Sequence, residues 1–219
     1  MQSTISTDLS IEKRGKPLSP YKPSHLVNFF SVIYNISEEL KQTLKSMITE
    51  ESYKRGEFLV REGEICDKMY YIKNGATRSY INHGKQEITT YISVENDFET
   101  SVSSFFSGKP SRENIEVLEP CQLEVLYKSD LYRLYEKFPE TNVIVRVILE
   151  EYYQAAEERA YMARVGTAVE KYQYLIETRG HFLNRIPLKH LASFLSMRLE
   201  TLSRLRTRHY RNKSEEKKE

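Results

Sequence analysis

The sequence contains few cysteines, no tryptophan and no long apolar run. Its 219 residues include only Cys66 and Cys121, too few for a disulfide framework or a four-thiolate cluster. No apolar stretch approaches the roughly 18 residues of a membrane span, and the N-terminus lacks the apolar core of a signal peptide. These absences argue against membrane and disulfide-rich secreted proteins, so we expect a folded cytoplasmic protein with no membrane partner.

Residues that would support catalysis or a metal centre are also scarce. Of the five histidines, only His83 lies among the predicted strands, where it stands beside Gly84 in a predicted turn. A metal-dependent oxygenase or isomerase needs several histidines and a carboxylate that converge. The chain also has no Gly-x-Ser-x-Gly motif and no Walker-type loop. We therefore expect no enzyme, no metal site and no certain cofactor.

The charge of the chain is unevenly distributed. Lys and Arg number 33 and Asp and Glu number 31, which gives a net charge of +2. From Arg164 to the C-terminus, however, 13 Lys or Arg stand against 6 Asp or Glu, so the remainder of the chain is acidic. A basic C-terminal part joined to an acidic body is typical of a nucleic-acid-binding module attached to a regulatory domain.

The stretch from Ile186 to Arg206 carries the clearest functional signal. Apolar residues repeat there at helical spacing in two short segments. They are Leu188, Leu191 and Ala192, then Leu199, Leu202 and Leu205. The spacing predicts two short helices joined by a tight turn, as in a helix-turn-helix module that reads the DNA major groove. A surface helix pair whose arginines are only solvated is the alternative. The residues expected to reach DNA are Arg198, Glu200, Thr201, Ser203, Arg204, Arg206 and Arg208.

Between Tyr53 and Leu126 the pattern changes to short β-branched and aromatic runs. Glycine and asparagine punctuate these runs at positions typical of turns, including Asn74-Gly75 and His83-Gly84. Many short strands at even spacing predict a jelly-roll-like sandwich or barrel. The predicted strands cover residues 57–60, 69–72, 76–81, 87–92, 114–117 and 121–126.

Helical patterns flank this β region. We expect a mobile polar arm over residues 1–24, a helical stretch over 26–47 in which Ser37 is a candidate N-cap, and a short helix over 129–138. A longer helix over about 141–164 contains no Gly or Pro and is apolar on more than one side, so we expect it to pair with the same helix of a second subunit. Burial within its own fold is the alternative. The residues expected on the dimer face are Ile144, Ile148, Tyr152, Ala155 and Met162.

This order of elements resembles the cyclic-AMP receptor/fumarate-nitrate regulator (Crp/Fnr) superfamily of bacterial transcription factors. Residues 53–63 and 69–75 are similar to the opening turns of the family's β-roll, and residues 200–204 are similar to the centre of its recognition helix. The resemblance implies a homodimer that binds a two-fold-symmetric operator in double-stranded DNA and contacts RNA polymerase. It also implies an α+β fold with an N-terminal double-stranded β-helix (jelly-roll) sensor domain over residues 25–140, a dimerisation helix over 141–165 and a C-terminal winged helix-turn-helix domain over 166–219.

Three positions organise the C-terminal domain. Gly166 interrupts the helical pattern and is a natural hinge after the long helix. A further helix ends at Gly180, a residue type that commonly follows a helix C-cap. The family usually adds a β-hairpin wing after its recognition helix, but the chain after Tyr210 is short and charged. We therefore expect a frayed tail there and a reduced wing or none.

The residues that would hold a ligand depart from the family pattern. In members that bind cyclic AMP, a Gly-Glu pair holds the ribose and an Arg-Ser pair holds the phosphate. These positions fall on Thr100-Ser101 and Ser111-Arg112, so the glutamate is absent and the arginine is displaced by one residue. We therefore expect a small effector other than a cyclic nucleotide, in a pocket formed by Glu99, Thr100, Ser101, Ser111 and Arg112.

Two alternatives stay open for the pocket. Glu99 and Arg112 lie close enough in the sequence to rebuild a cyclic-AMP or cyclic-GMP site after a small loop shift. Alternatively, the dimer binds DNA without a ligand, with Phe98, Phe105 and Phe106 filling the pocket. A polar pocket around residues 100–112 favours a sensor, whereas a pocket filled by its own side chains favours ligand-independent binding.

The resemblance also implies roles within the recognition helix. Glu200 can accept a hydrogen bond from a cytosine amino group, and Arg204 can donate in bidentate fashion to guanine. Thr201 and Ser203 are expected to meet phosphate or a thymine methyl, and the later arginines the DNA backbone. Leu199 stands where many members have arginine. An intrahelical ion pair between Glu200 and Arg204 is the alternative role for these two residues.

Overall fold

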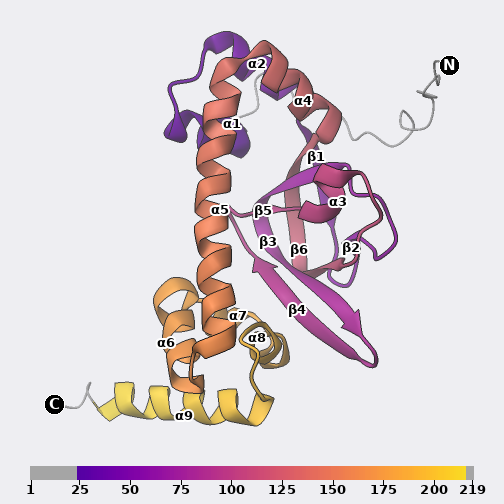
Figure 1. Cartoon of the computed structure of the whole chain (residues 1–219). Helices are drawn as coiled ribbons and strands as arrows, with labels where there is room; N and C mark the ends of the chain where they lie inside the picture. Colours follow the sequence, from indigo (N-terminus) through magenta and orange to yellow (C-terminus); the bar gives the residue numbers. More distant parts are fainter. Residues whose placement is uncertain (1–23, 216–219) are drawn as a thin grey trace.

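The computed structural model describes residues 24–215 and has the α+β architecture that the sequence predicts. A β-rich body lies beside one long helix, and shorter helices gather at the C-terminal end of that helix (Figure 1). Most of the predicted N-terminal arm, residues 1–23, and the end of the predicted tail, residues 216–219, lie outside the described residues.

The β-rich body is built on one antiparallel sheet. Its strands follow the order β1-β6-β3-β4, with β2 paired to β6 and β5 paired to β3. The strands are β1 (Thr49–Tyr53), β2 (Phe58–Val60), β3 (Lys68–His83), β4 (Gln86–Ser93), β5 (Phe98–Glu99) and β6 (Asn114–Tyr127). The two longest strands, β3 and β6, pair along most of their lengths and form the spine of the sheet. We call residues 49–127, which include the short helix α3 (Val102–Ser107), the β-roll.

Strand β3 corrects one prediction from the sequence. The sequence predicts a turn at Asn74-Gly75 between two strands, whereas the structure has one continuous strand with a bulge at this point. Gly75 has a φ of +109°, and a Cβ added to it would lie 2.5 Å from the Cys121 Sγ and 2.6 Å from the Pro120 carbonyl oxygen. Glycine therefore lets β3 pack closely against β6 at this position, and the bulge bends the strand without ending it.

Strand β6 differs from the prediction in the same way. The sequence predicts separate strands at residues 114–117 and 121–126, and the structure joins them through Pro120. Proline has no N–H to give to a strand ladder, but the register of β3 against β6 shifts between Asn74 and Ala76, opposite this proline. The irregular pairing accommodates Pro120 inside a long strand.

The N-terminal helical stretch that the sequence predicts forms two helices in the structure. α1 (His25–Ile33) ends at Tyr34, and α2 (Glu38–Met47) begins after Ser37. The Ser37 hydroxyl accepts a hydrogen bond from the Leu40 N–H at 3.2 Å, which is the N-cap contact that the sequence predicts. Both helices bury apolar side chains in a first hydrophobic cluster that also includes residues of the two helices that follow the β-roll.

A buried carboxylate attaches α1 to the sheet. Glu124 of β6 has no exposed surface and accepts hydrogen bonds from the Ser24 hydroxyl at 2.8 Å and from the N–H groups of His25 and Leu26 at 3.0 and 2.8 Å. The first turn of a helix offers unpaired N–H donors and the positive end of the helix dipole. The carboxylate therefore holds the N-terminus of α1 against the spine of the sheet.

Two helices follow the β-roll directly. α4 (Lys128–Lys137) starts where β6 ends, and α5 (Pro139–Val165) starts after the C-cap of α4. Pro139 is tolerated in the first turn of α5 because the N–H that it lacks would have no partner there. The 27 residues of α5 reach from the first hydrophobic cluster to the C-terminal helices, along one side of the β-roll (Figure 1).

The C-terminal helices are α6 (Ala168–Arg179), α7 (Phe182–Arg185), α8 (Leu188–Phe194) and α9 (Leu199–Glu215). A reciprocal capping box between Thr167 and Glu170 starts α6 immediately after the predicted hinge at Gly166. α9 continues beyond Tyr210 to Glu215, where the sequence predicts a tail, because no glycine or proline stops the helix. Within residues 24–215 no strand follows β6, so this part of the chain has no wing.

Two further hydrophobic clusters complete the core. One lies within the β-roll and is formed mainly by β2, β3 and β6. The other joins the β-roll to the C-terminal helices, because Ala76 and Ile92 of the sheet pack with Leu175, Phe182 and Leu191. The C-terminal helices therefore share a hydrophobic core with the sheet, in addition to their covalent connection to α5.

Replacing Gly75 by alanine tests the bulge in β3. The added Cβ would meet β6 at distances that force the backbone to move, and we expect the unfolding free energy to fall by about 2–4 kcal/mol. Gly84→Ala is the control, because Gly84 has a φ of +61° with open space around its Cβ and should cost about 1 kcal/mol. Urea denaturation followed by circular dichroism measures both. Equal losses would show that the contact with β6 adds no strain.

Candidate effector cavity and nucleic-acid interface

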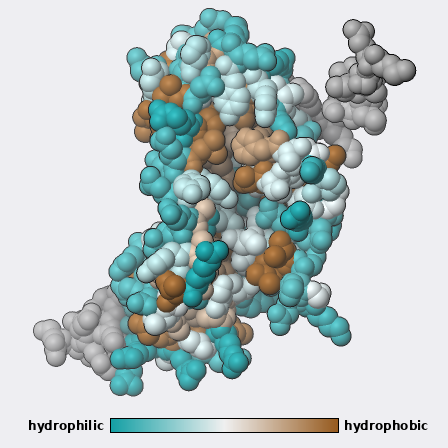
Figure 2. All heavy atoms as spheres, viewed as in Figure 1, coloured by the Kyte–Doolittle hydropathy of each residue, from teal (hydrophilic) through white to brown (hydrophobic). Residues whose placement is uncertain are grey.

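A cavity of about 190 Å³ lies between the β-roll and the N-terminal half of α5. Most of its wall is apolar, with Ile148 and Leu149 on the α5 side. Figure 2 shows apolar surface gathered in this region beside α5. Phe98, Phe105 and Phe106, which could have filled the pocket, form part of the wall and leave the volume open.

Two carboxylates form the polar end of the cavity. Glu99 of β5 is only 3% exposed, and its oxygens accept hydrogen bonds from the hydroxyls of Thr77 at 2.7 Å and Ser79 at 3.1 Å. Burial raises the pKa of Glu99 to about 7, and the negative charge of Glu113 acts in the same direction. Glu113 is half-buried and accepts a hydrogen bond from the Thr90 hydroxyl at 3.3 Å; burial raises the pKa of its carboxyl as well.

The residues predicted to form an effector pocket divide into two groups. Glu99 and Thr100 line the cavity. Ser101 and Ser111 are buried and joined to each other by a hydrogen bond of 2.8 Å between their hydroxyls, away from the cavity lining. Arg112, the next residue, is exposed and also lies outside the lining. The structure therefore does not place Arg112 at the cavity with Glu99.

Sequence reasoning missed Tyr91 and Arg159 and assigned Tyr152 only to the dimer face. All three line the cavity, where the rings of Tyr91 and Tyr152 lie 6.3 Å apart and the Arg159 guanidinium lies 4.6 Å above the Tyr91 ring. Tyr91 belongs to β4 and the other two residues to α5. The seven-residue spacing of Tyr152 and Arg159, which puts both on one face of a helix, is the only signal in the sequence that relates any of them.

The residues predicted to form the dimer face of α5 fall into two groups, one buried in the core of the same chain and one partly exposed. Ile144 has no exposed surface and Ile148 packs against the first hydrophobic cluster, so these two residues face the core of their own chain. Ala155 and Met162 are half-buried. The exposed large apolar residues of α5 are Leu149, Tyr152, Tyr153, Tyr161 and Val165.

α8 and α9 form a helix-turn-helix pair. The chain turns at Ser196, whose φ of +52° is left-handed, and the Met197 N–H donates to the Ala192 carbonyl at 2.9 Å. Leu191 of α8 and Leu202 of α9 have no exposed surface, and both belong to the cluster that joins the C-terminal helices to the sheet. Their burial fixes which side of α9 faces outward.

The outward side of α9 carries the predicted DNA-contacting residues, and this helix lies at the end of the molecule farthest from α1 and α2 (Figure 1). Leu199, at the start of the helix, is 43% exposed. No ion pair joins Glu200 to Arg204 within the part of the chain that the structure describes. Thr201 and Arg206 are half-buried. The exposed members of the predicted set are Arg198, Glu200, Ser203, Arg204 and Arg208.

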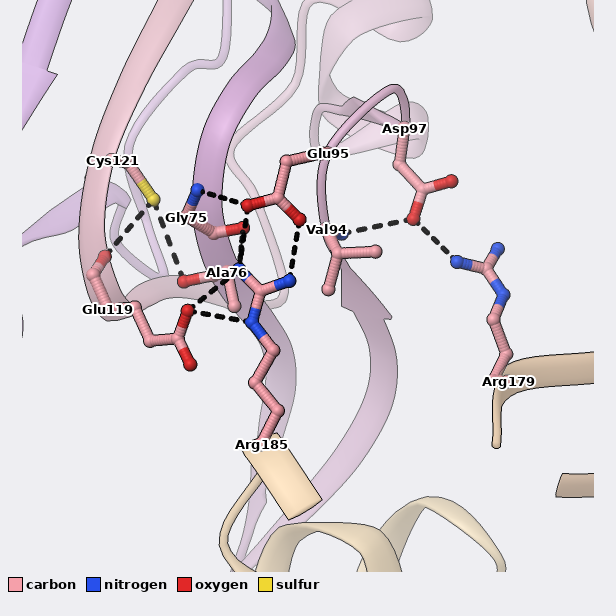
Figure 3. A network of polar contacts seen from close by, with 9 residues as sticks. All are labelled: Gly75, Ala76, Val94, Glu95, Asp97, Glu119, Cys121, Arg179 and Arg185. Atoms are coloured by element: carbon pink, nitrogen blue, oxygen red, sulfur yellow. Dashed lines mark hydrogen bonds and ion pairs between the residues drawn. The ribbon is translucent and has the colours of Figure 1, made fainter. Parts of the chain in front are cut away.

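Arg185 of α7 reaches back to the β-roll. Its guanidinium donates to Glu95 at 2.5 and 2.7 Å, to Glu119 at 2.8 Å and to the Gly75 carbonyl oxygen at 2.9 Å (Figure 3). The hydrogen bonds from Arg185 hold the pKa of Glu95 at about 2. Glu95 also accepts a hydrogen bond from the Gly75 N–H at 2.8 Å, so the bulge of β3 forms part of this interface.

Arg179, the last residue of α6, makes a second contact with the β-roll. It pairs with Asp97 at 2.6 Å and donates to the Tyr91 hydroxyl at 3.4 Å. Figure 3 shows Arg179 and Arg185 approaching the same edge of the β-roll from neighbouring C-terminal helices. Because Tyr91 also lines the cavity, this side chain links the cavity to the interface with the C-terminal helices.

A third contact lies beneath α8. Arg78 of β3 is buried, pairs with Glu87 at 2.7 Å and Glu116 at 2.6 Å, and approaches Nδ1 of His190 on α8 to 2.8 Å. Burial, with the charge of Arg78, lowers the pKa of His190 to about 4. The neutral ring can then accept the hydrogen bond from Arg78 through Nδ1.

Comparison with protein families identifies the β-roll. Residues 50–138 match the family model of the cyclic nucleotide-binding domain. The chain contains a cyclic nucleotide-binding domain. This domain supplies one wall of the cavity, and α5, which follows the matched residues, supplies the other. No curated protein sequence matches the chain.

Solved structures extend the comparison beyond the cyclic nucleotide-binding domain. FixK2 from Bradyrhizobium japonicum superposes with a TM-score of 0.65 at 19% identity, over 75% of this chain and 85% of its own. A putative transcriptional regulator of the Crp/Fnr family from Eubacterium rectale gives 0.63 at 15% identity, over 85% and 88% of the two chains. The Thermus thermophilus catabolite activator protein gives 0.51 at 17% identity, over 83% and 87%. The predicted fold, that of the Crp/Fnr regulators, is thereby confirmed.

None of the helices within residues 24–215 is both long enough and apolar enough to cross a membrane.

The pH dependence of the unfolding free energy tests whether Glu99 is protonated in the folded protein. A pKa raised from 4.5 to about 7 means that the folded protein binds this proton more tightly than the unfolded chain. Stability should therefore fall as pH rises through this range, by about 3 kcal/mol relative to Glu99→Gln, which does not titrate. His190 has the opposite effect at acidic pH, but it is present in both proteins and cancels in the comparison. Urea denaturation at pH 5 and pH 8 measures the difference, and parallel pH profiles would contradict a raised pKa.

Arg185→Ala tests the interface between the β-roll and the C-terminal helices. Loss of two partly exposed ion pairs should weaken the packing of α7 and α8 by about 1–3 kcal/mol. Hydrogen exchange should then be faster in residues 182–194 and unchanged in β3 and β6. Arg146→Ala, which removes an exposed pair with Glu150 on α5, is the control. Unchanged exchange in Arg185→Ala would show that the hydrophobic cluster alone positions these helices.

Proposed function

We propose that this protein is a dimeric, DNA-binding transcription regulator of the Crp/Fnr type whose cavity senses a small effector. One observation carries the proposal: the helix-turn-helix pair presents an uncovered, arginine-bearing face of α9 while its other side packs on a cyclic nucleotide-binding domain with an open cavity. The basic charge of the C-terminal part, against the acidic remainder, supports the same assignment. The proposed domains are a sensor domain over residues 25–140, a dimerisation helix over 141–165 and a helix-turn-helix domain over 166–219.

The exposed residues of α9 suit base readout in a major groove. Glu200 and Arg204 stand one helical turn apart, so both can reach base edges from the same side of the helix. Arg204 is our candidate for a bidentate contact with guanine, and Glu200 for a contact with a cytosine amino group. Arg208, farther along the helix, is better placed for the DNA backbone, which sets affinity rather than sequence preference.

A second copy of the chain is the partner that α5 suits. Large exposed side chains such as Leu149, Tyr153 and Tyr161 leave an apolar surface on one helix, which is unusual for a monomer. Pairing of two α5 helices would cover these residues and place the two α9 helices about a two-fold axis. A symmetric operator with half-sites about 34 Å apart would then be read by one α9 each, and RNA polymerase is the expected partner on DNA.

The cavity supports an effector other than a cyclic nucleotide. Ser101 and Ser111 occupy the positions that the family resemblance assigns to the ribose-binding glutamate and the phosphate-binding arginine, and their hydroxyls bond to each other. A cyclic phosphate would therefore lack the arginine of the family's phosphate site, while Glu99 and Glu113 would repel it. The open volume of about 190 Å³ favours sensing over ligand-independent binding.

The regulatory mechanism is a two-state equilibrium in the position of the C-terminal helices. A ligand shifts such an equilibrium only if it binds the two states with different affinities. The Tyr91 ring lines the cavity, and its hydroxyl accepts a hydrogen bond from Arg179. A ligand that moves this ring would change the contact that ties α6 to the β-roll and, through it, the presentation of α9.

Selection of operator sequences from random double-stranded DNA tests the proposal, and Arg204→Ala tests the readout. This variant should bind the selected operator more weakly by about 1–3 kcal/mol and relax the preference at one base position. Arg208→Ala is the matched control and should weaken operator and random DNA alike. Equal losses on both DNAs for Arg204→Ala would limit this residue to a phosphate contact, and failure to select any sequence would refute the regulator assignment.

A further inference from the structure

The two carboxylates at the polar end of the cavity have hydroxyl partners but no cationic one. Within residues 24–215 no ion pair joins Glu99 or Glu113 to a Lys, Arg or His. Their hydrogen bonds come from the hydroxyls of Thr77 and Ser79, for Glu99, and of Thr90, for Glu113. Arg159 also lines the cavity, but its guanidinium lies over the Tyr91 ring instead. The polar end of the cavity therefore presents carboxyl oxygens that no described cation pairs with directly, and a bound cation would favour their charged form.

Neither a metal ion nor an anion fits this end of the cavity. Hard cations such as Ca²⁺ and Mg²⁺ take six or more oxygen ligands, and the described residues contain no group of three or more His, Cys, Asp or Glu that could hold a metal. An anionic ligand would place its charge against Glu99 and Glu113. The group that best complements two carboxyls is a positively charged one that donates hydrogen bonds.

The walls beside the carboxylates are aromatic and apolar. The rings of Phe98, Tyr91 and Tyr152 line the cavity, and aromatic faces attract cations electrostatically. The Arg159 guanidinium already uses the Tyr91 face in this way, at 4.6 Å from the ring centroid. Toward α1 and α4 the lining contains no further charged side chain and offers room for an apolar group.

We propose that the cavity binds an organic amine: a molecule with an apolar or aromatic body and a protonated amino group that pairs with Glu99 and Glu113. As the effector class of the same cavity, this assignment rests on the proposed function. The carboxylate oxygens retain acceptor capacity beyond the bonds from Thr77, Ser79 and Thr90. The amino group would donate to these oxygens, and the apolar body would lie between α5 and the β-roll.

Such a ligand would contact the side chain that links the cavity to the C-terminal helices. Tyr91 lines the cavity beside Tyr152 and accepts a hydrogen bond from Arg179, which pairs with Asp97. An amine packed against the Tyr91 ring would therefore favour one position of that ring. This gives the ligand a direct route to the interface that positions α9.

Isothermal titration of the full chain with phenethylamine tests the proposal. Phenylacetate has an aromatic ring on a short chain of similar length but carries the opposite charge, and cyclic AMP represents the anionic ligands of the domain family. We expect saturable binding of phenethylamine, and at least tenfold weaker binding of phenylacetate and cyclic AMP, because Glu99 and Glu113 select the sign of the charge.

Two variants connect the binding to the cavity. The double variant Glu99→Gln/Glu113→Gln keeps the size of both side chains and should bind phenethylamine at least tenfold more weakly. Glu62→Gln, at an exposed glutamate outside the lining, is the matched control and should bind as the parent does. Val102→Trp fills the cavity from α3 with both carboxylates intact and should abolish binding, which keeps the test decisive if the double variant does not fold.

Three results would overturn the assignment: no binding of phenethylamine, equally tight binding of phenylacetate or cyclic AMP, or unchanged phenethylamine binding in the folded double variant. The operator selection is carried out both without and with phenethylamine, so that an effector-dependent regulator is also detected and the two proposals fail separately. A protein that selects an operator but binds no amine refutes only the ligand class. A protein that binds the amine through Glu99 and Glu113 but selects no operator refutes the regulator assignment and leaves the cavity assignment standing.

Discussion

The contact between the β-roll and the C-terminal helices, an apolar cluster with the guanidinium of Arg185 at its edge, is the interaction on which the arrangement of the molecule depends. The guanidinium binds Glu95 and Glu119 and takes the Gly75 carbonyl as a third acceptor, while the Gly75 N–H binds Glu95. The bulge that bends β3 therefore also contacts α7, through the hydrogen bond from Arg185 to the Gly75 carbonyl oxygen. Because α7 leads directly into the helix-turn-helix pair, the attachment of Arg185 to the sheet helps to place that pair relative to the β-roll.

The interface around Arg185 combines apolar and polar parts of different strength. Phe182 and Leu191 are fully buried and make a contact that salt does not screen. The ion pairs of Arg179 and Arg185 are partly exposed, so each contributes little by itself and weakens as salt increases. A ligand with a modest difference in affinity for two positions of the C-terminal helices can therefore shift the equilibrium between them. Tyr91 connects the cavity to this interface, because it lines the cavity and accepts a hydrogen bond from Arg179.

Local signals in the sequence locate most elements but not their continuity. The N-cap at Ser37 and the buried positions Leu191 and Leu202 follow from residue type and spacing within a few residues. The sequence predicts breaks at Gly75 and between residues 117 and 121, where the structure has continuous strands, because turns and bulges use the same residue types. Only the pairing of β3 with β6 distinguishes the two, and that pairing joins residues far apart in the chain.

The sequence by itself determined the fold class, the order of the elements and the exposed polar side of α9, because periodicity and composition within short windows specify them. The tertiary structure alone decided which side chains form the cavity. Glu99 and Arg112 are close in the sequence, yet only Glu99 lines the cavity, whereas Tyr91 and Arg159 are distant and meet there. The physical reason is that spacing assigns a residue to one side of its own helix or strand, but the packing of the whole chain decides what that side will face.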